Sequence, residues 1–100
     1  MTEIPAPFKG RQPLAVSRTE SFSRDFKNLP KKIQERAEKA IQLLARDPHY
    51  PSLRTKKMRA PGGIWEASVS ISYRITFQWA GEQLLLRRIG THDILEVELR

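Results

Sequence analysis

The chain has 100 residues, no cysteine and a net charge of +7 at pH 7. This length predicts one domain, and the lack of cysteine excludes disulfides and cysteine-ligated zinc sites. No apolar run approaches the ~20 residues that cross a membrane, and the first residues lack the apolar stretch of a signal peptide. We therefore expect a cytoplasmic protein with no membrane contact, and the basic charge favours an anionic partner such as nucleic acid.

Residues 1–13 are predicted to form a flexible N-terminal arm, because three prolines and one glycine interrupt them. The rest of the chain, residues 14–100, is predicted to be a single domain. The segment PLAVSRT, residues 13–19, is read as a short first strand.

Apolar side chains then recur at three- and four-residue steps from Phe22 to Leu44, the period of a helix. Pro30 suits the first turn of a helix but not its interior. The sequence therefore predicts two helices, at 21–28 and 30–46, which form a helical hairpin with one apolar stripe.

Residues 65–79 alternate strictly between apolar and polar side chains, the pattern of a sheet with one apolar and one polar face. Because these 15 residues exceed an ordinary strand, we expect two strands joined near 70–72. A turn at 80–82 then leads into a third strand at 83–89. The predicted fold class is α+β, with an N-terminal strand and a helical hairpin packed on an antiparallel β-meander.

The polar face of this meander is expected to stay open. It carries Glu66 and Arg74, which share the same parity along the strands. A basic loop at 52–63 and the segment RRIGTHD at 87–93 are expected at its margins.

Three segments carry a resemblance to a known family. FSRDFKNLPKKIQERAEKAIQLLARDP looks like its helical hairpin, and HYPSLRTKKM followed by IWEASVSISYRITFQW looks like its approach to the central strands. LLLRRIGTHDIL looks like its last strand, which ends in a hydrophobic-Gly-x-His motif. In this order the segments resemble the RelE/ParE toxin superfamily of bacterial toxin–antitoxin systems, over about residues 14–95.

The resemblance implies one of two activities. Members of the RelE, YafQ and YoeB types cut mRNA in the ribosomal A site, whereas ParE-like members poison DNA gyrase, and a cognate antitoxin neutralises both kinds. We expect the toxin of a type II system that cleaves mRNA on the ribosome by acid–base chemistry, with no metal or other cofactor. The alternatives are a gyrase inhibitor and a non-catalytic, degenerate toxin homologue.

Metal-independent RNA cleavage requires a proton to leave the 2′-hydroxyl, charge to be stabilised at phosphorus and the 5′-oxygen to be protonated. His92 stands where the YafQ and YoeB types place a catalytic histidine, so we assign it as general acid or base; the alternative is a loop histidine that bonds backbone. Arg74 matches the family's strand arginine, which contacts the scissile phosphate. Its alternative role is an ordinary cross-strand ion pair with Glu66.

Arg87 and Arg88 are predicted to point to opposite faces of the last strand, so that only one serves the site. Leucines occur at both alternating positions of the strand, so they do not indicate which of the two arginines faces the site. We favour Arg88 as catalytic because its parity includes Gly90, where a loop could open toward the ligand. Arg87 is kept as a substrate-binding residue at the sheet edge.

Arg54, Lys56 and Lys57 lie in a stretch without acidic residues and match a basic region of the family. They are expected to bind RNA phosphates, or else to form an ordinary solvated loop. No aromatic residue follows His92, although the RelE type stacks a base on a tyrosine there. Stacking would then fall to Tyr50, Tyr73 or Trp65.

Three further residues are possible members of the site. His49 is a second acid–base candidate, or a cap at the end of the second helix. Glu66 could act as a base, although its position does not match the carboxylate of the YoeB type. Asp93 either orients His92 and raises its pKa, or begins a helical turn.

Overall fold

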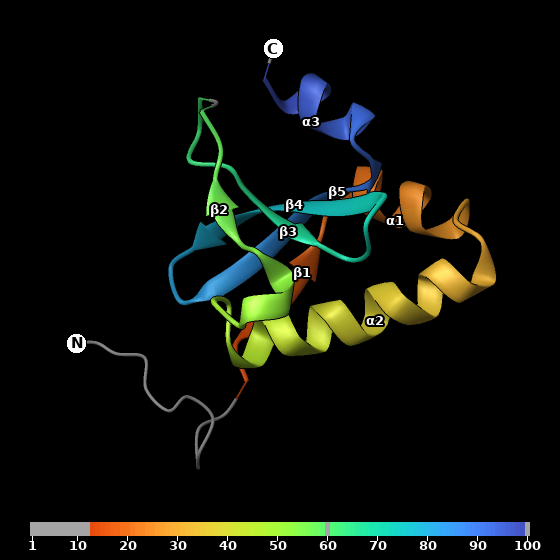
Figure 1. Cartoon of the computed structure of the whole chain (residues 1–100). Helices are drawn as coiled ribbons and strands as arrows, with labels where there is room; N and C mark the ends of the chain where they lie inside the picture. Colours follow the sequence, from red (N-terminus) through yellow and green to blue (C-terminus); the bar gives the residue numbers. More distant parts are fainter. Residues whose placement is uncertain (1–12, 60, 100) are drawn as a thin grey trace.

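The computed structural model describes residues 13–59 and 61–99, so the predicted arm lies outside it apart from Pro13. Its elements follow in the order β1 (Ala15–Arg18), α1 (Glu20–Lys27), α2 (Lys31–Arg46), the 3-10 helix η1 (Pro51–Leu53), β2 (Lys56–Lys57), β3 (Trp65–Ser68), β4 (Tyr73–Ala80), β5 (Gln83–Thr91) and α3 (Asp93–Glu98). Figure 1 shows the sheet with α2 beneath it and α3 above it. The predicted α+β class and the order of strand, helical hairpin and meander are confirmed.

The residue that precedes each helix of the hairpin determines where that helix begins. Thr19 Oγ1 accepts a hydrogen bond from the backbone N–H of Phe22 at 3.0 Å and so caps α1. Pro30 directly precedes α2, a position where its missing N–H leaves no helical bond unmade. The predicted helices at 21–28 and 30–46 are confirmed to within one residue.

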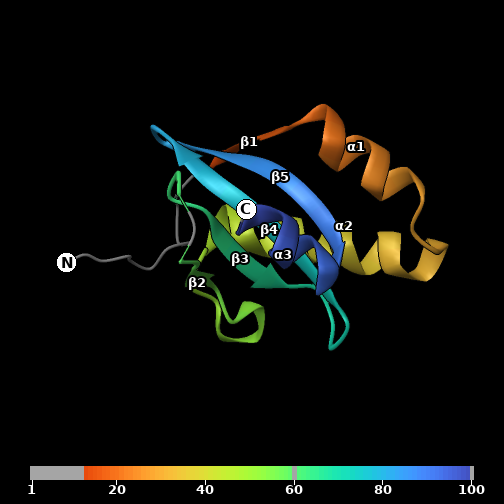
Figure 2. The same cartoon turned by 90° about the horizontal axis from the view of Figure 1, so that it is seen from above.

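In the described residues, five strands form one sheet in the order β1-β5-β4-β3-β2. β1 runs parallel to β5, and the other neighbours are antiparallel. Figure 2, seen from above, shows β1 and β2 toward opposite edges of the sheet. The two residues of β2 were not predicted, because so short a strand cannot display an alternation.

One face of the sheet packs on the helices. The core consists of Phe22 in α1, Ala37, Ala40, Ile41 and Leu44 in α2, Leu53, and Ala67, Ile75, Phe77, Leu84, Leu86 and Ile89 in the sheet. The alternation predicted this face for Ala67, Ile75 and Phe77, and it is confirmed. Since each fully buried Phe or Leu contributes roughly 1.5–3 kcal/mol, this layer holds the strands rigid beneath the opposite face.

The opposite face, here called the polar face, carries Glu66, Arg74, Thr76, Gln78 and Arg87. The prediction that it stays open is wrong, because α3 covers part of it. Thr76 Oγ1 donates a hydrogen bond to Glu98 Oε2 at 2.6 Å, and both side chains are buried. Six residues are too few for a helical period to predict this cover.

A β-bulge in β5 brings a second arginine to the polar face. Thr76 pairs with Arg88 and Phe77 pairs with Leu86, so Arg87 is an extra residue between them. Simple alternation along the last strand therefore fails at Arg87.

Candidate active site on the polar face

Arg74 is fixed in the middle of the polar face. Its Nη1 donates hydrogen bonds to the carbonyl oxygens of Ser70, Ile71 and Tyr73 at 2.7, 3.2 and 3.1 Å. Its Nε lies 3.8 Å from Glu66 Oε1, on the neighbouring strand. The shared face of Arg74 and Glu66 is as predicted, and the loop carbonyls hold the guanidinium more firmly than a solvated ion pair would.

Glu66 is a buried carboxylate between two cations. It is 8 % exposed, and its Oε2 lies 3.9 Å from Nζ of Lys56 on β2. Lys56 pairs with Glu66 in the ladder, whereas Lys57 pairs with Trp65. The register therefore places Lys56 on the polar face and Lys57 on the other side, so the two lysines do not act together.

Arg87 and Glu98 form the second charged pair of the face. Arg87 donates from Nε and Nη2 to the two carboxylate oxygens of Glu98 at 2.9 and 3.0 Å, and from Nη1 to Gln78 Oε1 at 2.8 Å. Burial raises the pKa of the Glu98 carboxyl, but hydrogen bonds from Arg87 and Thr76 and the charges of Arg87 and Arg88 outweigh it, so that the pKa lies below its ordinary value. Glu98 is thus an anion held in the fork of an arginine.

Arg88 serves a different part of the fold. Its Nε and Nη2 donate to the two carboxylate oxygens of Asp25 in α1 at 2.7 and 3.1 Å. Asp25 also accepts a hydrogen bond from the backbone N–H of Ile89 at 3.1 Å, beyond the end of β1. The hydrogen bond to Asp25 raises the pKa of Arg88 despite partial burial. The expectation that Arg87 and Arg88 point to opposite faces is wrong, because the bulge brings Arg87 onto the polar face while Arg88 pairs there with Thr76. The two arginines differ in their partners, since Asp25 binds the guanidinium of Arg88.

His92 lies at the junction of β5 and α3. It is exposed and occupies the N-cap position of α3, and its carbonyl accepts a hydrogen bond from the Leu95 N–H at 3.0 Å. Asp93 is the first residue of α3, so the structure matches its reading as the start of a helical turn. Within residues 13–59 and 61–99 no hydrogen bond holds the His92 ring, and the imidazole can therefore meet a ligand from solvent.

Gly90 allows α3 to fold back over the sheet. It pairs with Arg74 in the ladder, and a Cβ atom at this position would lie 2.9 Å from Cγ2 of Ile94. The expected opening beside Gly90 is therefore filled by Ile94.

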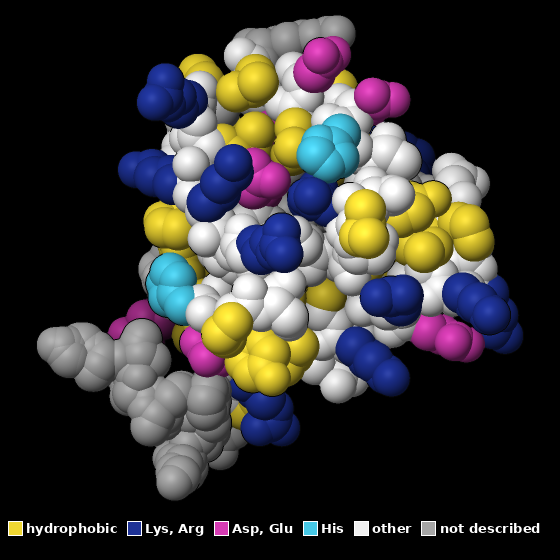
Figure 3. Space-filling view, in the orientation of Figure 1, with side chains coloured by type: hydrophobic (Ala, Val, Ile, Leu, Met, Phe, Trp, Pro, Cys, Tyr) yellow, Lys and Arg dark blue, Asp and Glu magenta, His cyan; other side chains and the backbone are white. Residues whose placement is uncertain are grey.

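The other predicted residues lie at the margins of the face or away from it. His49 is exposed, and its ring meets the edge of Trp65 at a centroid distance of 6.2 Å. Trp65 and Tyr73 have the parity of the core face, which leaves the exposed Tyr50 as the stacking candidate outside the sheet. Figure 3 shows the two histidines well apart, with Lys and Arg side chains between them.

Arg54 is the C-cap of η1 and is held at a φ of 47°, a left-handed conformation that is uncommon for a residue other than glycine. Sequence reasoning did not single out Thr76 and Gln78 on the polar face, and it missed Glu98. The parity of Thr76 and Gln78 was visible in the strand pattern, but the partner that makes them significant comes from α3.

Among the described residues, no group of three or more His, Cys, Asp or Glu side chains could hold a metal ion. None of the described helices is both long and apolar enough to cross a membrane.

A family model described as the ParE-like toxin domain matches residues 31–94. The chain belongs to the ParE-like toxin family. It is thereby a member of the RelE/ParE superfamily, as its sequence resemblance predicts. The match includes most of the polar face of this toxin, from Lys56 to His92, but ends before Glu98. A search of the curated proteins by sequence finds no match.

Solved toxin structures share the fold of this ParE-like protein. YafQ from Escherichia coli, in a complex with DinJ, superposes with a TM-score of 0.70 at 18% identity, over 82% of this chain and 97% of that chain. The RelBE2 toxin–antitoxin complex from Mycobacterium tuberculosis contains a chain with a TM-score of 0.67 at 25% identity, over 79% and 91%. A YoeB/ParE toxin from Agrobacterium tumefaciens gives 0.67 at 14% identity, over 79% and 99%.

Proposed function

We propose that this toxin is an mRNA endoribonuclease whose active site is the polar face. The observation that carries the proposal is the convergence of Arg74 and Arg87 on one sheet face, with the exposed His92 where β5 leaves it. A phosphodiester needs two such components, fixed positive charge and a proton carrier. Cleavage on the ribosome follows from the resemblance to the RelE and YafQ types.

In the proposed reaction the 2′-oxygen attacks phosphorus, and the bond from phosphorus to the 5′-oxygen breaks. The products are a 2′,3′-cyclic phosphate and a 5′-hydroxyl. One group removes the 2′-hydroxyl proton and another protonates the leaving oxygen, and His92 takes one of these steps because an imidazole can both accept and donate a proton. Arg74 bears the negative charge that grows on the phosphate oxygens.

Glu66 is proposed as a positioning residue in this scheme. Its carboxylate lies 3.8 Å from Arg74 Nε and 3.9 Å from Lys56 Nζ, so it keeps both cations on the polar face. Arg54 and Lys56 are proposed to bind flanking phosphates. Lys57, on the other side of β2, is proposed to contribute only to the general basic charge.

Arg87 is proposed to replace Arg88 as the second phosphate-binding arginine. Its guanidinium fork is occupied by Glu98, so a phosphate that reaches it must displace this carboxylate and with it the end of α3. Arg88 is proposed to have a structural role, because its ion pair with Asp25 links α1 to β5 beyond the end of β1.

We further propose that a cognate antitoxin binds this protein. The comparison structures support this partner because E. coli YafQ was solved with DinJ and the mycobacterial and archaeal proteins as RelE–RelB-type complexes.

A second candidate function is gyrase poisoning, which the ParE-like family description favours. Pulse labelling after induced expression in a bacterium separates the two. A ribonuclease is expected to stop methionine incorporation within minutes, before thymidine incorporation falls. An early loss of thymidine incorporation with continued protein synthesis would instead support gyrase as the target, and no arrest of either would support a non-catalytic homologue.

A further inference from the structure

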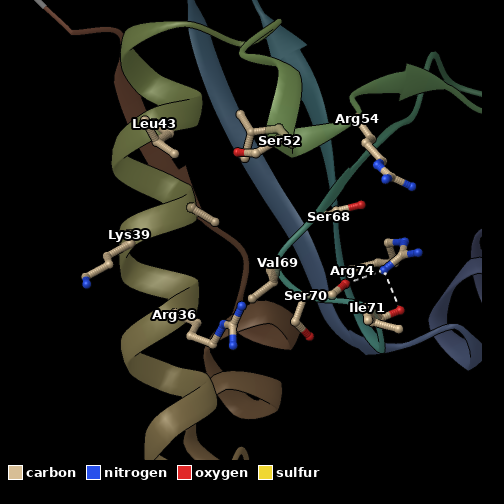
Figure 4. A pocket seen from close by; sticks show the side chains of 12 residues that line it. Arg36, Lys39, Leu43, Ser52, Arg54, Ser68, Val69, Ser70, Ile71 and Arg74 are labelled. Carbon is tan, nitrogen blue, oxygen red and sulfur yellow. Dashed lines mark hydrogen bonds between the residues drawn. The ribbon is translucent and has the colours of Figure 1, made fainter.

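A groove beside the polar face shares Arg54 and Arg74 with the proposed site, but its α2 wall has no role in the proposed chemistry. It has a volume of about 410 Å³ and lies between α2, η1 and the hairpin that joins β3 to β4. Its walls are formed by Arg36, Lys39, Ala40 and Leu43 of α2, Ser52, Leu53 and Arg54, and Ser68, Val69, Ser70, Ile71 and Arg74 of the hairpin. Figure 4 shows Arg36 extending from α2 toward the hairpin and Lys39 extending from α2 away from it.

The groove is lined by one sign of charge. Arg36, Lys39, Arg54 and Arg74 contribute four cations from three parts of the chain, and no carboxylate among the described residues lines the groove. In the part of the chain that the structure describes, Arg36, Lys39 and Arg54 form no salt bridge. Three of the four cations thus lack an acidic partner, and such an excess of positive charge creates a local potential that attracts an anion.

The groove is continuous with the polar face. Arg74 and Ser68 belong to both, because they pair across β3 and β4 and also line the groove. β2 pairs with Trp65 and Glu66, so within the described residues the later part of β3 has no strand on its outer side. Figure 4 shows the guanidinium groups of Arg54 and Arg74 on the same side of β3, with Arg36 on the α2 side.

We propose that this groove binds the phosphodiester backbone of the RNA next to the nucleotide held on the polar face. The inference rests on the proposed function, since it assigns the substrate of that same site a second contact area. Guanidinium forks pair with phosphate oxygens, and the hydroxyls of Ser52, Ser68 and Ser70 add hydrogen-bond donors between the cations. A strand lying across Arg74 would continue into the groove toward Arg36, which lines its α2 wall.

The test compares two double variants of α2 in the full chain. Arg36→Gln with Lys39→Gln removes the charges on the α2 wall of the groove, whereas Lys31→Gln with Lys32→Gln removes two exposed charges of the same helix outside the groove. The probe is a fluorescent single-stranded oligonucleotide with 2′-O-methyl groups, which binds but cannot be cleaved. Affinity is measured over a range of salt concentrations, and circular dichroism checks that each variant is folded.

The slope of log affinity against log salt is expected to flatten by about 1.4 in the groove variant, because each phosphate contact on a single strand contributes about 0.7. The control variant is expected to keep the native slope. Equal slopes in the native chain and the groove variant, or an equal loss in both variants, would overturn the proposal. If the groove variant is unaffected toward RNA but loses affinity for an acidic peptide, the groove binds a protein segment instead. A single change at Arg36 or Lys39, with an expected loss of about 0.7, serves if the double variant does not fold.

This outcome is separable from that of the proposed function. A flattened slope in a protein that never cuts RNA would support the groove as a phosphate-binding site and refute the proposed nuclease activity. RNA cleavage together with an unchanged slope in the groove variant would support the nuclease activity and refute RNA binding in the groove.

Discussion

Replacing Glu98 with Gln is expected to release α3 from the polar face. The carboxylate accepts hydrogen bonds from Arg87 at 2.9 and 3.0 Å and from Thr76 at 2.6 Å, and the residue is only 7 % exposed. The amide of Gln keeps one acceptor oxygen but turns an N–H₂ group toward the guanidinium. The charged pair is lost while the size of the side chain is retained.

The free energy of α3 docking that this change removes can be estimated from the solvent exposure of Arg87. Hydrogen bonds to charged groups contribute roughly 1.5–3 kcal/mol each, but the Arg87 side chain is 33% exposed, so water compensates part of the loss. We therefore take the lower end, about 1.5 kcal/mol for docking of α3, which is roughly a tenfold rise in the undocked population.

Hydrogen exchange measures this population. The Leu99 amide, which donates to Leu95 within α3, is expected to exchange roughly tenfold faster in Glu98→Gln, while amides of β4 keep their native rates. Glu96→Gln is the matched control, because Glu96 is an exposed acid on the same helix. If Glu98→Gln and Glu96→Gln exchange alike, Glu98 does not hold α3 and the reasoning fails.

The pH dependence has a definite sign. The pKa of Glu98 is lowered in the folded chain, so its contribution is fully present above the ordinary value of 4.5 and is lost as the pH falls below it. The NMR signal of the Ile94 methyl groups is expected to move toward its undocked position in that range in the native chain. The Glu98→Gln variant is expected to lack this titration.

Two further changes test other parts of the account. Gly90→Ala is expected to destabilise α3 by about 1–3 kcal/mol, because its Cβ would lie 2.9 Å from Ile94 Cγ2. In urea unfolding, combining Gly90→Ala with Ile94→Ala should recover much of this loss, because the second change removes the atom that clashes. A double variant whose loss equals the sum of the two single losses would refute the clash. Asp25→Asn is expected to lower global stability by about 1–3 kcal/mol, because the carboxylate accepts from Arg88 at 2.7 and 3.1 Å and from the Ile89 N–H at 3.1 Å. An unchanged urea midpoint in Asp25→Asn would contradict the structural role of Arg88.

The helices and the two faces of β3 and β4 were predictable because each depends on a local period. Pro30 marked the break between the helices, and the alternation from Trp65 to Trp79 survived the loop that joins the strands. Glu66 and Arg74 were therefore placed on one face correctly.

The covered part of the site was not predictable by the same means. The leucine run in β5 has no alternation, so the sequence does not reveal the bulge that brings Arg87 to the polar face in addition to Arg88. The contact between Glu98 and Arg87 joins residues whose proximity depends on the fold of a six-residue helix. A pattern of residue types carries no information on such a contact.

The central claim is that the polar face cleaves mRNA with His92 as a proton carrier. The most direct test is to map 5′ ends of a translated mRNA by primer extension after induced expression of the native chain, His92→Ala and His49→Ala. His49 is the matched control, because it is also exposed but packs against Trp65 away from the polar face. We predict new ends within the reading frame for the native chain and His49→Ala, and their loss in His92→Ala. Growth arrest without new ends, or ends that persist in His92→Ala, would contradict the account.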